Sequence, residues 1–345
     1  MVTSPRPASP LLNLGETNLA EYLVGRGLLE RSDDAEVRTL SGGYINNVFR
    51  VQSAERIYIV KQSFPAAQRT VLQADIRRAL MEVAAMKAIK KLLGVHAPIP
   101  TILDDDPDNY VSVMTAAPDD SVLYDTELLV GRFHPGTGRC LGSYAARLHD
   151  ATCGSSEIAH DFKDNPGFAL RDQSIRSAAP TNPDLVPLID TMLLRNLEQA
   201  RVLVDADITP KNVLVHNGGI TKLDFECAQW GDPAFDVGII LAHFVLLGFA
   251  QPSLRDGFLA EARGCYEAYA SIWREARSPR FVADVAQYAA VMMLGRADGD
   301  LVFEYLIPHR PALRTLVGRL SADVMSIDEL LALADTTLAD LAAED

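Results

Sequence analysis

Three side chains that could carry out phosphoryl-transfer chemistry are spaced closely between residues 204 and 238. Asp207 is followed five residues later by Asn212, and Asp224 comes twelve residues after that. A carboxylate beside a hydroxyl nucleophile can orient it, while an amide oxygen and a second carboxylate can hold Mg²⁺ against nucleotide phosphates. Each residue alone has an ordinary interpretation, in a turn or at a strand end. Their joint spacing, with the β-type run Val213–Val215 between Asn212 and Asp224, favours a catalytic hairpin.

A second group of residues, nearer the N-terminus, could bind nucleotide phosphates. Lys61 follows the apolar run Ile57–Val60, and the preceding strand is entered from a turn that contains Gly42 and Gly43. Backbone N–H groups of such a turn can approach a phosphate closely. Glu82 lies on the next predicted helix and could reach back to Lys61, holding it over the α- and β-phosphates. A lysine in a sheet is ordinarily solvated and most Gly-Gly turns are plain hairpin turns, so neither feature is specific alone.

The elements that must position these residues fall into two parts. Before residue 118 the sequence predicts helices and hairpins in the order helix 12–30, strands Tyr44–Gln52 and Ile57–Gln62, helix Val71–Leu93, and strands Thr101–Leu103 and Tyr110–Thr115. After it, the sequence predicts helices near 124–151, 183–200, 233–249, 252–277, 279–297 and 321–343, and one β-type stretch, Val202–Val215, that turns at His216–Gly219 into Ile220–Asp224. We therefore expect an α+β fold with two lobes. Residues 1–117 would form a small β-rich nucleotide-binding lobe, and residues 118–345 a larger helical lobe with the catalytic loop and the acceptor site.

Composition and charge narrow the class of protein. The 345 residues are 48% hydrophobic and carry a formal net charge of −14, so the chain can bury a large core and repels phosphate backbones and anionic lipid. This disfavours nucleic acid and membrane partners. Four cysteines without a CxxC pair indicate reduced thiols rather than a zinc site. The N-terminus lacks a signal-peptide pattern and the longest apolar stretch, Val237–Ala250, is too short to span a membrane, so we expect a cytoplasmic protein.

Taken together, several motifs resemble one enzyme superfamily. They are SGGYINNVFRV (41–51), YIVKQ (58–62), Glu82, YVSVMTAAP (110–118), LGSYAARLHDAT (141–152), DADITPKN (205–212), LDFECAQWGDPAFDVG (223–238) and LGRADGD (294–300). They are similar to the aminoglycoside phosphotransferase and choline kinase superfamily, with N-lobe similarity to methylthioribose kinases. The resemblance runs from about residue 15 to residue 310. It implies a protein-kinase-like fold and transfer of the γ-phosphate of ATP to a small-molecule hydroxyl.

The resemblance also assigns roles. It implies that Asp207 is the catalytic residue and that Asn212 and Asp224 are the Mg²⁺ ligands. Lys61 and Glu82 would form the phosphate-binding pair. The main chain at Met114–Ala117 would bind the adenine edge, chiefly through Thr115 and Ala117. Asp236 would brace the catalytic loop from the start of a core helix, a structural role.

One departure from the family pattern concerns the catalytic loop. Where the family has His-Gly-Asp, this chain has Asp205-Ala206-Asp207. The family His is a support residue that packs behind the metal-binding segment, whereas Asp205 adds a like charge two residues from Asp207. If Asp207 is catalytic, Asp205 must point away, held by a backbone N–H or a basic side chain, and Asp205→His should keep or raise activity. The alternatives are a nucleotide-binding pseudokinase with a scaffold or regulatory role, and an unrelated acidic α/β binding protein in which the spacing is chance.

The sequence does not name the acceptor. An aminoglycoside, a sugar or a nucleoside-like hydroxyl all agree with the motifs. His149 is expected to be a packed helix residue rather than a ligand. The candidate residues for the wall of the acceptor site are Glu226, Trp230, Asp232, Arg296, Glu304 and Tyr305.

Overall fold

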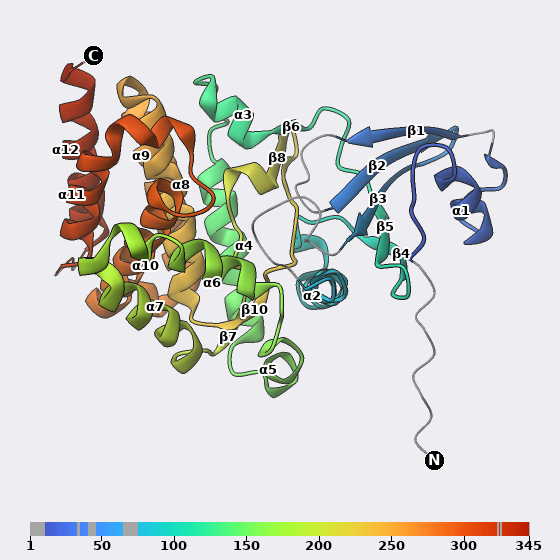
Figure 1. Ribbon diagram of the computed structural model, residues 1–345, viewed down its shortest axis with the longest axis horizontal. Coiled ribbons are helices and arrows are strands. Elements are labelled where there is room, and N and C mark those ends of the chain that lie inside the picture. The colour runs from blue at the N-terminus through green and yellow to red at the C-terminus, as the bar shows by residue number, and fades with distance from the viewer. Residues whose placement is uncertain are drawn as a thin grey trace.

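The computed structural model describes residues 11–32, 35–40, 46–64, 75–322, 324 and 326–344. The chain forms a small sheet-containing lobe and a larger helical lobe that lie side by side, with the long helix α2 (Arg78–Leu93) at their junction (Figure 1). This confirms the predicted α+β bilobal fold. The division at residues 117 and 118 remains our proposed one.

The small lobe is built on a five-stranded antiparallel sheet with strand order β1-β2-β3-β5-β4. Its strands are β1 (Ala35–Leu40), β2 (Asn46–Ser53), β3 (Ile57–Ser63), β4 (Ile102–Asp106) and β5 (Val111–Thr115). Both predicted hairpins are present, and β1 is an edge strand that the sequence analysis missed. Gly42 and Gly43 lie outside the described residues.

The sheet positions Lys61 through the two-residue alternation of a strand. Val60 is buried in a core with Phe49, Val51 and residues of helix α1 (Leu19–Gly25). Its neighbour Lys61 therefore faces the other side of the sheet, where Ile59 packs against the core of the helical lobe. Lys61 consequently points toward α2 and the helical lobe.

Helix α2 presents Glu82 on its buried face. Ala85, Met86 and Ile89 follow Glu82 at helical spacing, and all four side chains are buried. The helix ends at Gly94, whose φ of +54° suits glycine. The predicted helix started at Val71, but in the described residues α2 begins at Arg78; residues 71–74 are outside them.

Helices dominate the larger lobe. They are α3 (Tyr124–Leu129), α4 (Thr137–Thr152), α5 (Ser156–Phe162), α6 (Phe168–Arg176), α7 (Val186–Glu198), α8 (Pro233–Ala250), α9 (Arg255–Ile272), α10 (Pro279–Asp298), α11 (Arg310–Leu320) and α12 (Ile327–Glu344). Short 3₁₀ helices lie in the connecting segments of this lobe: η4 (Ala179–Thr181), η5 (Pro183–Leu185), η6 (Pro210–Asn212), η7 (Pro252–Leu254), η8 (Arg274–Arg277) and η9 (Glu304–His309). One more, η3 (Gly94–His96), follows α2 in the small lobe.

Helix α8 forms the centre of this lobe, between α9 and α10. Asp232 caps its N-terminus, where its carboxylate accepts a hydrogen bond from the Ala234 N–H at 3.0 Å, and Pro233 occupies the first turn. Among the described helices α8 alone is long and apolar enough to cross a membrane, but 94% of it is buried inside the protein. It is the core helix that the sequence predicted.

Five short strands carry the loops of the candidate site. β7 (Val202–Val204) pairs with β10 (Gln229–Gly231), while β8 (Val213–His216) pairs with β9 (Gly219–Lys222) and with β6 (Val122–Leu123). The predicted continuous stretch Val202–Val215 was wrong, because a loop and η6 separate β7 from β8. The backbone N–H groups of Asp205 and Ala206 bond a side-chain carboxylate instead of a neighbouring strand.

Two helix predictions were also too long. Residues 12–30 contain only the seven-residue α1, and Gly27 with φ +73° follows its end. The predicted helix 124–151 is divided into α3 and α4, because Gly131 and Gly136 adopt positive φ between them. Helices α5, α6 and α11 were not predicted.

Candidate active site

Lys61 joins three elements through two ion pairs. Its Nζ lies 2.8 Å from Glu82 Oε1 on α2 and 3.0 Å from Asp224 Oδ1 in the loop after β9. Burial would lower the pKa of Lys61, but Asp224 and Glu82 outweigh it and hold that pKa above its usual value. The contact between Lys61 and Glu82 that the sequence predicted is therefore present, and it also reaches Asp224.

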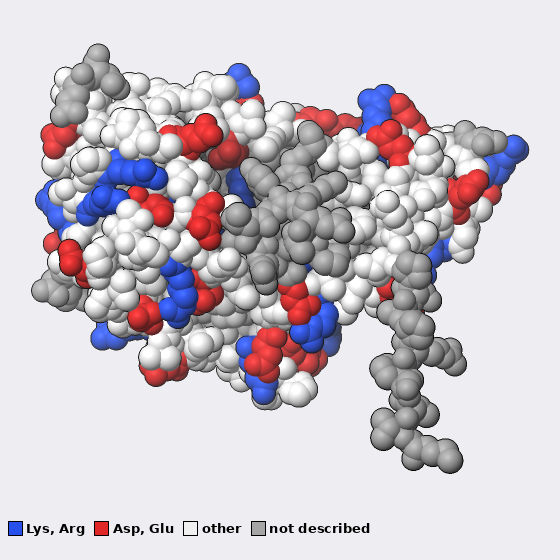
Figure 2. Space-filling model, viewed as in Figure 1, with Lys and Arg blue, Asp and Glu red and all other residues white. Residues whose placement is uncertain are grey.

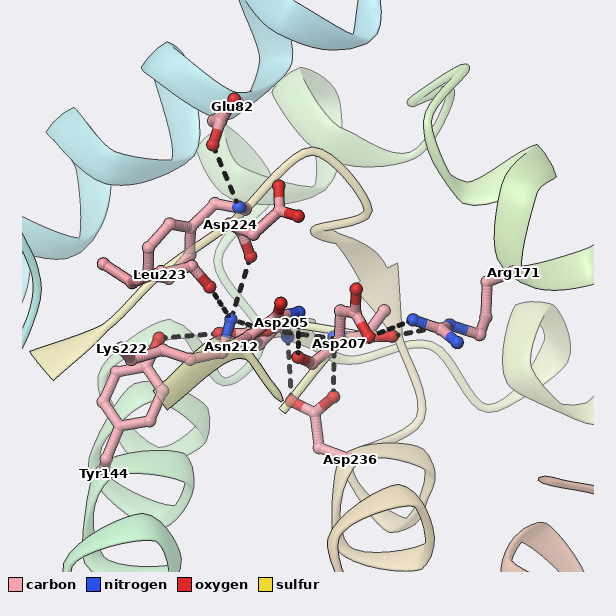
Figure 3. A network of polar contacts seen from close by, with 12 residues as sticks. Glu82, Tyr144, Arg171, Asp205, Asp207, Asn212, Lys222, Leu223, Asp224 and Asp236 are labelled. Carbon is pink, nitrogen blue, oxygen red and sulfur yellow. Dashed lines mark hydrogen bonds and ion pairs between the residues drawn. The ribbon is translucent and has the colours of Figure 1, made fainter. Parts of the chain in front are cut away.

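Asp224 adopts an unusual backbone conformation that Lys222 supports. The φ of Asp224 is +66°, in the left-handed region that aspartate tolerates better than most residues. The fully buried ammonium of Lys222 donates to the carbonyls of Leu223 at 2.6 Å and Asp224 at 2.9 Å, as Figure 3 shows. Lys222 thereby holds the chain on both sides of this conformation.

The same ammonium neutralises Asp205. Lys222 Nζ lies 3.0 Å from Asp205 Oδ1, and neither side chain is exposed to solvent. The Tyr144 hydroxyl on α4 donates to Asp205 Oδ2 at 3.0 Å. Burial raises the pKa of Asp205 to about 6, although Lys222 opposes the rise. The expectation that a basic side chain holds Asp205 is confirmed, and that side chain is Lys222.

Asp236 fixes the backbone of the same loop. Its carboxylate accepts hydrogen bonds from the N–H groups of Asp205 at 2.8 Å and Ala206 at 2.7 Å. His149 contacts Asp236 at 3.1 Å and the Tyr269 hydroxyl at 2.9 Å, so it is a packed, hydrogen-bonded helix residue. These bonds hold Ala206 at φ +60°, a conformation that costs an alanine more than a glycine.

Asp207 is held by a residue that the sequence analysis missed. Arg171 on α6 forms a buried ion pair with the Asp207 carboxylate, and its Nε donates to the Ala206 carbonyl at 3.0 Å. Burial would raise the pKa of Asp207, but Arg171 and more distant cations hold it well below its usual value. Asp207 is therefore ionised. No spacing in the sequence connects Arg171 to a loop that begins more than thirty residues later.

The start of α6 is anchored on the loop that carries Asp224. The Asn165 amide donates to the carbonyls of Glu226 at 2.9 Å and Ala228 at 2.6 Å. Gly167 approaches this loop so closely that a Cβ there would lie 1.9 Å from the Glu226 carbonyl oxygen. This close approach places Arg171 one turn further along α6, within reach of Asp207.

The predicted Mg²⁺ ligands, Asn212 and Asp224, are close neighbours in the structure. The Leu223 N–H donates to the Asn212 carbonyl at 2.8 Å, and the Asn212 Nδ2 donates to the Asp207 carbonyl at 3.2 Å. The amide nitrogen is therefore occupied, while the Asn212 side-chain oxygen is left to act as a ligand.

Further carboxylates surround Asp224. Oxygen atoms of Glu82, Asp224 and Glu226 lie within 4.8 Å of one another. Glu82 is paired with Lys61, and Glu226 lies 3.0 Å from the buried Arg78. Oxygen donors of this kind suit Mg²⁺, and Asp224 is the most solvent-accessible of the three, with one third of its side chain exposed. These residues fit the ion that the sequence predicts.

The predicted adenine-binding segment, Met114–Ala117, begins with the last two residues of β5. The Thr115 N–H already donates to the Thr101 carbonyl at 3.0 Å. Within the described residues, no backbone hydrogen bond involves Ala117. Of the two candidates, Ala117 therefore has backbone groups free to bind the adenine edge, whereas the N–H of Thr115 is already used.

The candidate acceptor-wall residues are dispersed. Asp232 is the α8 cap and lies 3.2 Å from Arg195, and Glu226 pairs with Arg78, so both have structural partners. Trp230 packs partly buried in β10, and Glu304 is exposed on η9. Of this set, Arg296 lies with its guanidinium carbon 5.2 Å from the centroid of the Phe303 ring, and that ring lies 5.5 Å from the Tyr305 ring. The charge of Arg296 also helps to lower the pKa of Asp207.

Comparisons with solved structures show proteins of the same fold. The choline/ethanolamine kinase family protein of Mesorhizobium loti shares the fold with a TM-score of 0.57 at 15% identity, covering 93% of this chain and 100% of that chain. The Plasmodium vivax ethanolamine kinase gives 0.55 at 11% identity, covering 98% and 92%. The amicoumacin kinase hAmiN, solved with AMP-PNP, Ca²⁺ and Ami, gives 0.54 at 14% identity, covering 94% and 96%. These similarities concern the fold.

The sequence itself matches a family model. No curated protein shows significant sequence similarity to the chain. The resemblance to methylthioribose kinases in the small lobe remains a prediction. The model of the "Phosphotransferase enzyme family" (APH) matches residues 36–277, which include the sheet, α2, the catalytic loop and α8. Because this match spans most of its length, the chain belongs to the APH phosphotransferase family.

Proposed function

We propose that the protein is an ATP- and Mg²⁺-dependent kinase that transfers the γ-phosphate to a hydroxyl of a small molecule. The observation that carries the proposal is the position of Lys61, which lies 2.8 Å from Glu82 and 3.0 Å from Asp224 and so connects the sheet, α2 and the Asp224 loop. Phosphoryl transfer depends on such positioning of charges around the phosphates. The complex of hAmiN with AMP-PNP and Ca²⁺ is consistent with nucleotide and metal use in this fold.

Each of these residues has its own role in the proposed reaction. Ionised Asp207 orients the acceptor hydroxyl and accepts its proton, and Arg171 fixes the direction of that carboxylate. Lys61 neutralises charge on the nucleotide phosphates, and Ala117 offers backbone groups to the adenine edge. Asn212 and Asp224 would hold Mg²⁺, which supplies charge neutralisation at the transferred phosphoryl group when bound.

The acceptor is proposed only as a class. The relatives named above act on choline or ethanolamine, or bind amicoumacin, by their names. An aminoglycoside, a sugar or a nucleoside-like alcohol remains the proposed class of acceptor for this chain, with no nucleic acid or membrane partner.

The pseudokinase alternative depends on Asp205, and the contacts of Asp205 favour the enzyme. The carboxylate is turned to Lys222 and Tyr144, and its other contact is the Asp207 N–H at 3.2 Å. Its negative charge is thus compensated by Lys222 on β9, with a hydrogen bond from Tyr144 on α4, rather than directed at the Asp207 carboxylate.

Turnover of ATP against a panel of hydroxyl acceptors tests the proposal. Asp207→Ala should lower kcat by about 10²–10⁴, because positioned general-base catalysis contributes that much. Asp184→Ala, which removes an exposed carboxylate from η5, is the matched control and should leave kcat unchanged. Full activity of Asp207→Ala would mean that the catalytic residue is misassigned. Binding of MgATP without turnover of any acceptor would support the pseudokinase.

A further inference from the structure

Arg296, near the end of α10, is a buried cation without an anionic partner. It is 2% exposed, and within the described parts of the chain its guanidinium makes no hydrogen bond or ion pair. The guanidinium makes a cation–π contact with the Phe303 ring, whose centroid lies 5.2 Å from the guanidinium carbon. A buried charge left unpaired in this way destabilises a fold.

The surroundings of Arg296 are rich in positive charge. Helix α10 packs on α6, where a Cβ on Gly295 would lie 2.9 Å from the Ser174 carbonyl oxygen, and α6 carries Arg171. Burial and the like charge of Arg171 lower the pKa of Arg296 to about 10. The carboxylate whose charge acts most on Arg296, that of Asp207, is already paired with Arg171. Arg171 and Arg296 therefore share one carboxylate, which leaves one of these two positive charges uncompensated.

We take the acceptor side of Asp207 to be the side opposite the residues predicted to bind nucleotide. The residues predicted to bind nucleotide, Lys61 and Glu82, reach the site from β3 and α2 through Asp224. Figure 3 shows Glu82 and Asp224 on one side of Asp207 and Arg171 on the other. Arg296 lies on the same side as Arg171, because its helix α10 packs on α6. Exposed Lys211, four residues after Asp207, adds another positive charge that acts on Asp207.

We infer that Arg296 binds an oxyanion of the acceptor, so that the substrate carries a carboxylate or phosphate group besides the hydroxyl that is phosphorylated. The inference rests on the proposed function and gives the acceptor a chemical class. The planar guanidinium offers paired N–H donors that match the oxygens of either group. A hydroxy acid or a phosphorylated alcohol is thus preferred over a polycationic aminoglycoside, which the buried arginines would repel.

Thermal unfolding tests the site without turnover. The protein is saturated with MgADP, which fills the nucleotide-phosphate positions, and is then heated with glycerol, glycerate or glycerol 3-phosphate at constant ionic strength. The anion that fits should raise Tm by about 3 °C at ten times its Kd, whereas glycerol should not. The two anions distinguish a carboxylate from a phosphate as the recognised group.

Arg296→Met separates binding from structural support. This variant should melt at the wild-type temperature or higher without anion, because it removes an unpaired buried charge, and it should lose the anion-dependent rise. Arg319→Met, which removes an exposed cation from α11, is the control and should retain that rise. If Arg296→Met does not fold, Arg296→Gln takes its place with the same expectation. A wild type that responds to neither anion, or an Arg296 variant that keeps the response, overturns the inference.

Kinetics distinguish this role from contact with the transferred phosphoryl group. Arg296→Met should raise KM for anionic acceptors about 10–100-fold, the size of a charge-assisted contact, with kcat changed only a few-fold. An equal loss of kcat for charged and uncharged acceptors would place Arg296 on the phosphoryl group and overturn the inference. Absence of turnover with every acceptor, alongside an Arg296-dependent rise in Tm, would instead overturn the kinase proposal and leave the anion site standing.

Discussion

Asp205 and Lys222 form an ion pair in which neither charge can be removed alone without a large penalty. Both side chains are fully buried, 3.0 Å apart, and Lys222 also bonds two carbonyls next to Asp224. Removing one partner of a buried pair leaves the other charge uncompensated, which costs more than removing both. The expectation that Asp205→His keeps or raises activity therefore no longer holds, because a histidine there would leave Lys222 without its carboxylate.

A double-mutant cycle measures this coupling. We expect Lys222→Met to lower the free energy of unfolding by about 3–5 kcal/mol and the double variant Asp205→Asn/Lys222→Met to lower it by less. Urea unfolding gives the four free energies. If the Lys222→Met variant is soluble and folded, its kcat should also be lower than that of the wild type, because the carbonyls of Leu223 and Asp224 lose their hydrogen bonds to Lys222. Strict additivity of the two single changes would show that the pair is not coupled.

Lys61 is the residue whose replacement should act most directly on nucleotide use. Lys61→Ala removes the cation between Glu82 and Asp224, so ATP binding weakens and kcat/KM for ATP should fall by about 10²-fold or more. Steady-state kinetics against ATP concentration provide the measurement. Lys87→Ala, which removes a half-exposed lysine from the same helix as Glu82, should leave kcat/KM unchanged. Equal values for the two variants would remove Lys61 from the nucleotide site.

At this scale the sequence predicts the candidate chemical residues and the bracing residue Asp236, but it misses the supports Arg171 and Lys222. Asp207, Asn212 and Asp224 are recognisable because one hairpin carries them at fixed spacing. Arg171 and Lys222 act through contacts with residues 36 and 17 positions away, at Asp207 and Asp205, which periodicity and turn rules do not encode. Such pairs become visible only when the elements have been packed.

Long helices with a strong apolar pattern were predicted from the sequence, and short helices in polar stretches were not. The long, strongly apolar helices α8 and α10 were predicted to within a few residues. Short α5 and α6 lie in a polar stretch and owe their stability to tertiary contacts, such as those of Asn165 with the Glu226 and Ala228 carbonyls. Local propensity cannot reveal a helix of this kind.

The contact at the start of α6 supplies a prediction for a whole element. In Gly167→Ala the added Cβ would lie 1.9 Å from the backbone oxygen of Glu226, so α6 must shift away from the Asp224 loop. We expect a loss of about 1–3 kcal/mol in the free energy of unfolding, together with reduced kcat as Arg171 moves relative to Asp207.

A glycine on another helix is the matched control. Gly318 on α11 has open space where its Cβ would be, so Gly318→Ala should stabilise the protein by about 0.5–1 kcal/mol and leave kcat unchanged. Denaturant unfolding and turnover are measured on both variants. If Gly167→Ala is as stable and active as wild type, the close approach of α6 does not position Arg171.

For the whole molecule, the buried charged contacts between the two lobes gather at one place, whereas the pairs Arg50–Asp119 and Lys91–Glu157 join the lobes at the surface. Arg78 and Glu82 on α2, and Lys61 on β3, meet Asp224 and Glu226 in the loop after β9. The surface of one face carries acidic and basic groups side by side, with no continuous basic region (Figure 2). Acidic and basic groups are thus mixed on this face, and the buried charges that connect the lobes gather where nucleotide and metal are proposed to bind.

Binding at this junction should stabilise both lobes together. MgATP at a hundred times its Kd should raise the free energy of unfolding by about 2.7 kcal/mol, seen as a rise of several degrees in Tm, because the ligand binds only the folded chain. Chelation of Mg²⁺ should reverse most of this rise, since the acidic groups around Asp224 repel uncompensated phosphates. In Asp224→Asn the part of the rise that depends on Mg²⁺ should be lost and turnover abolished, while a weaker response to nucleotide remains. A Mg²⁺-dependent rise of wild-type size in Asp224→Asn would exclude Asp224 as a metal ligand and leave Asn212 and the neighbouring carboxylates to be tested in its place.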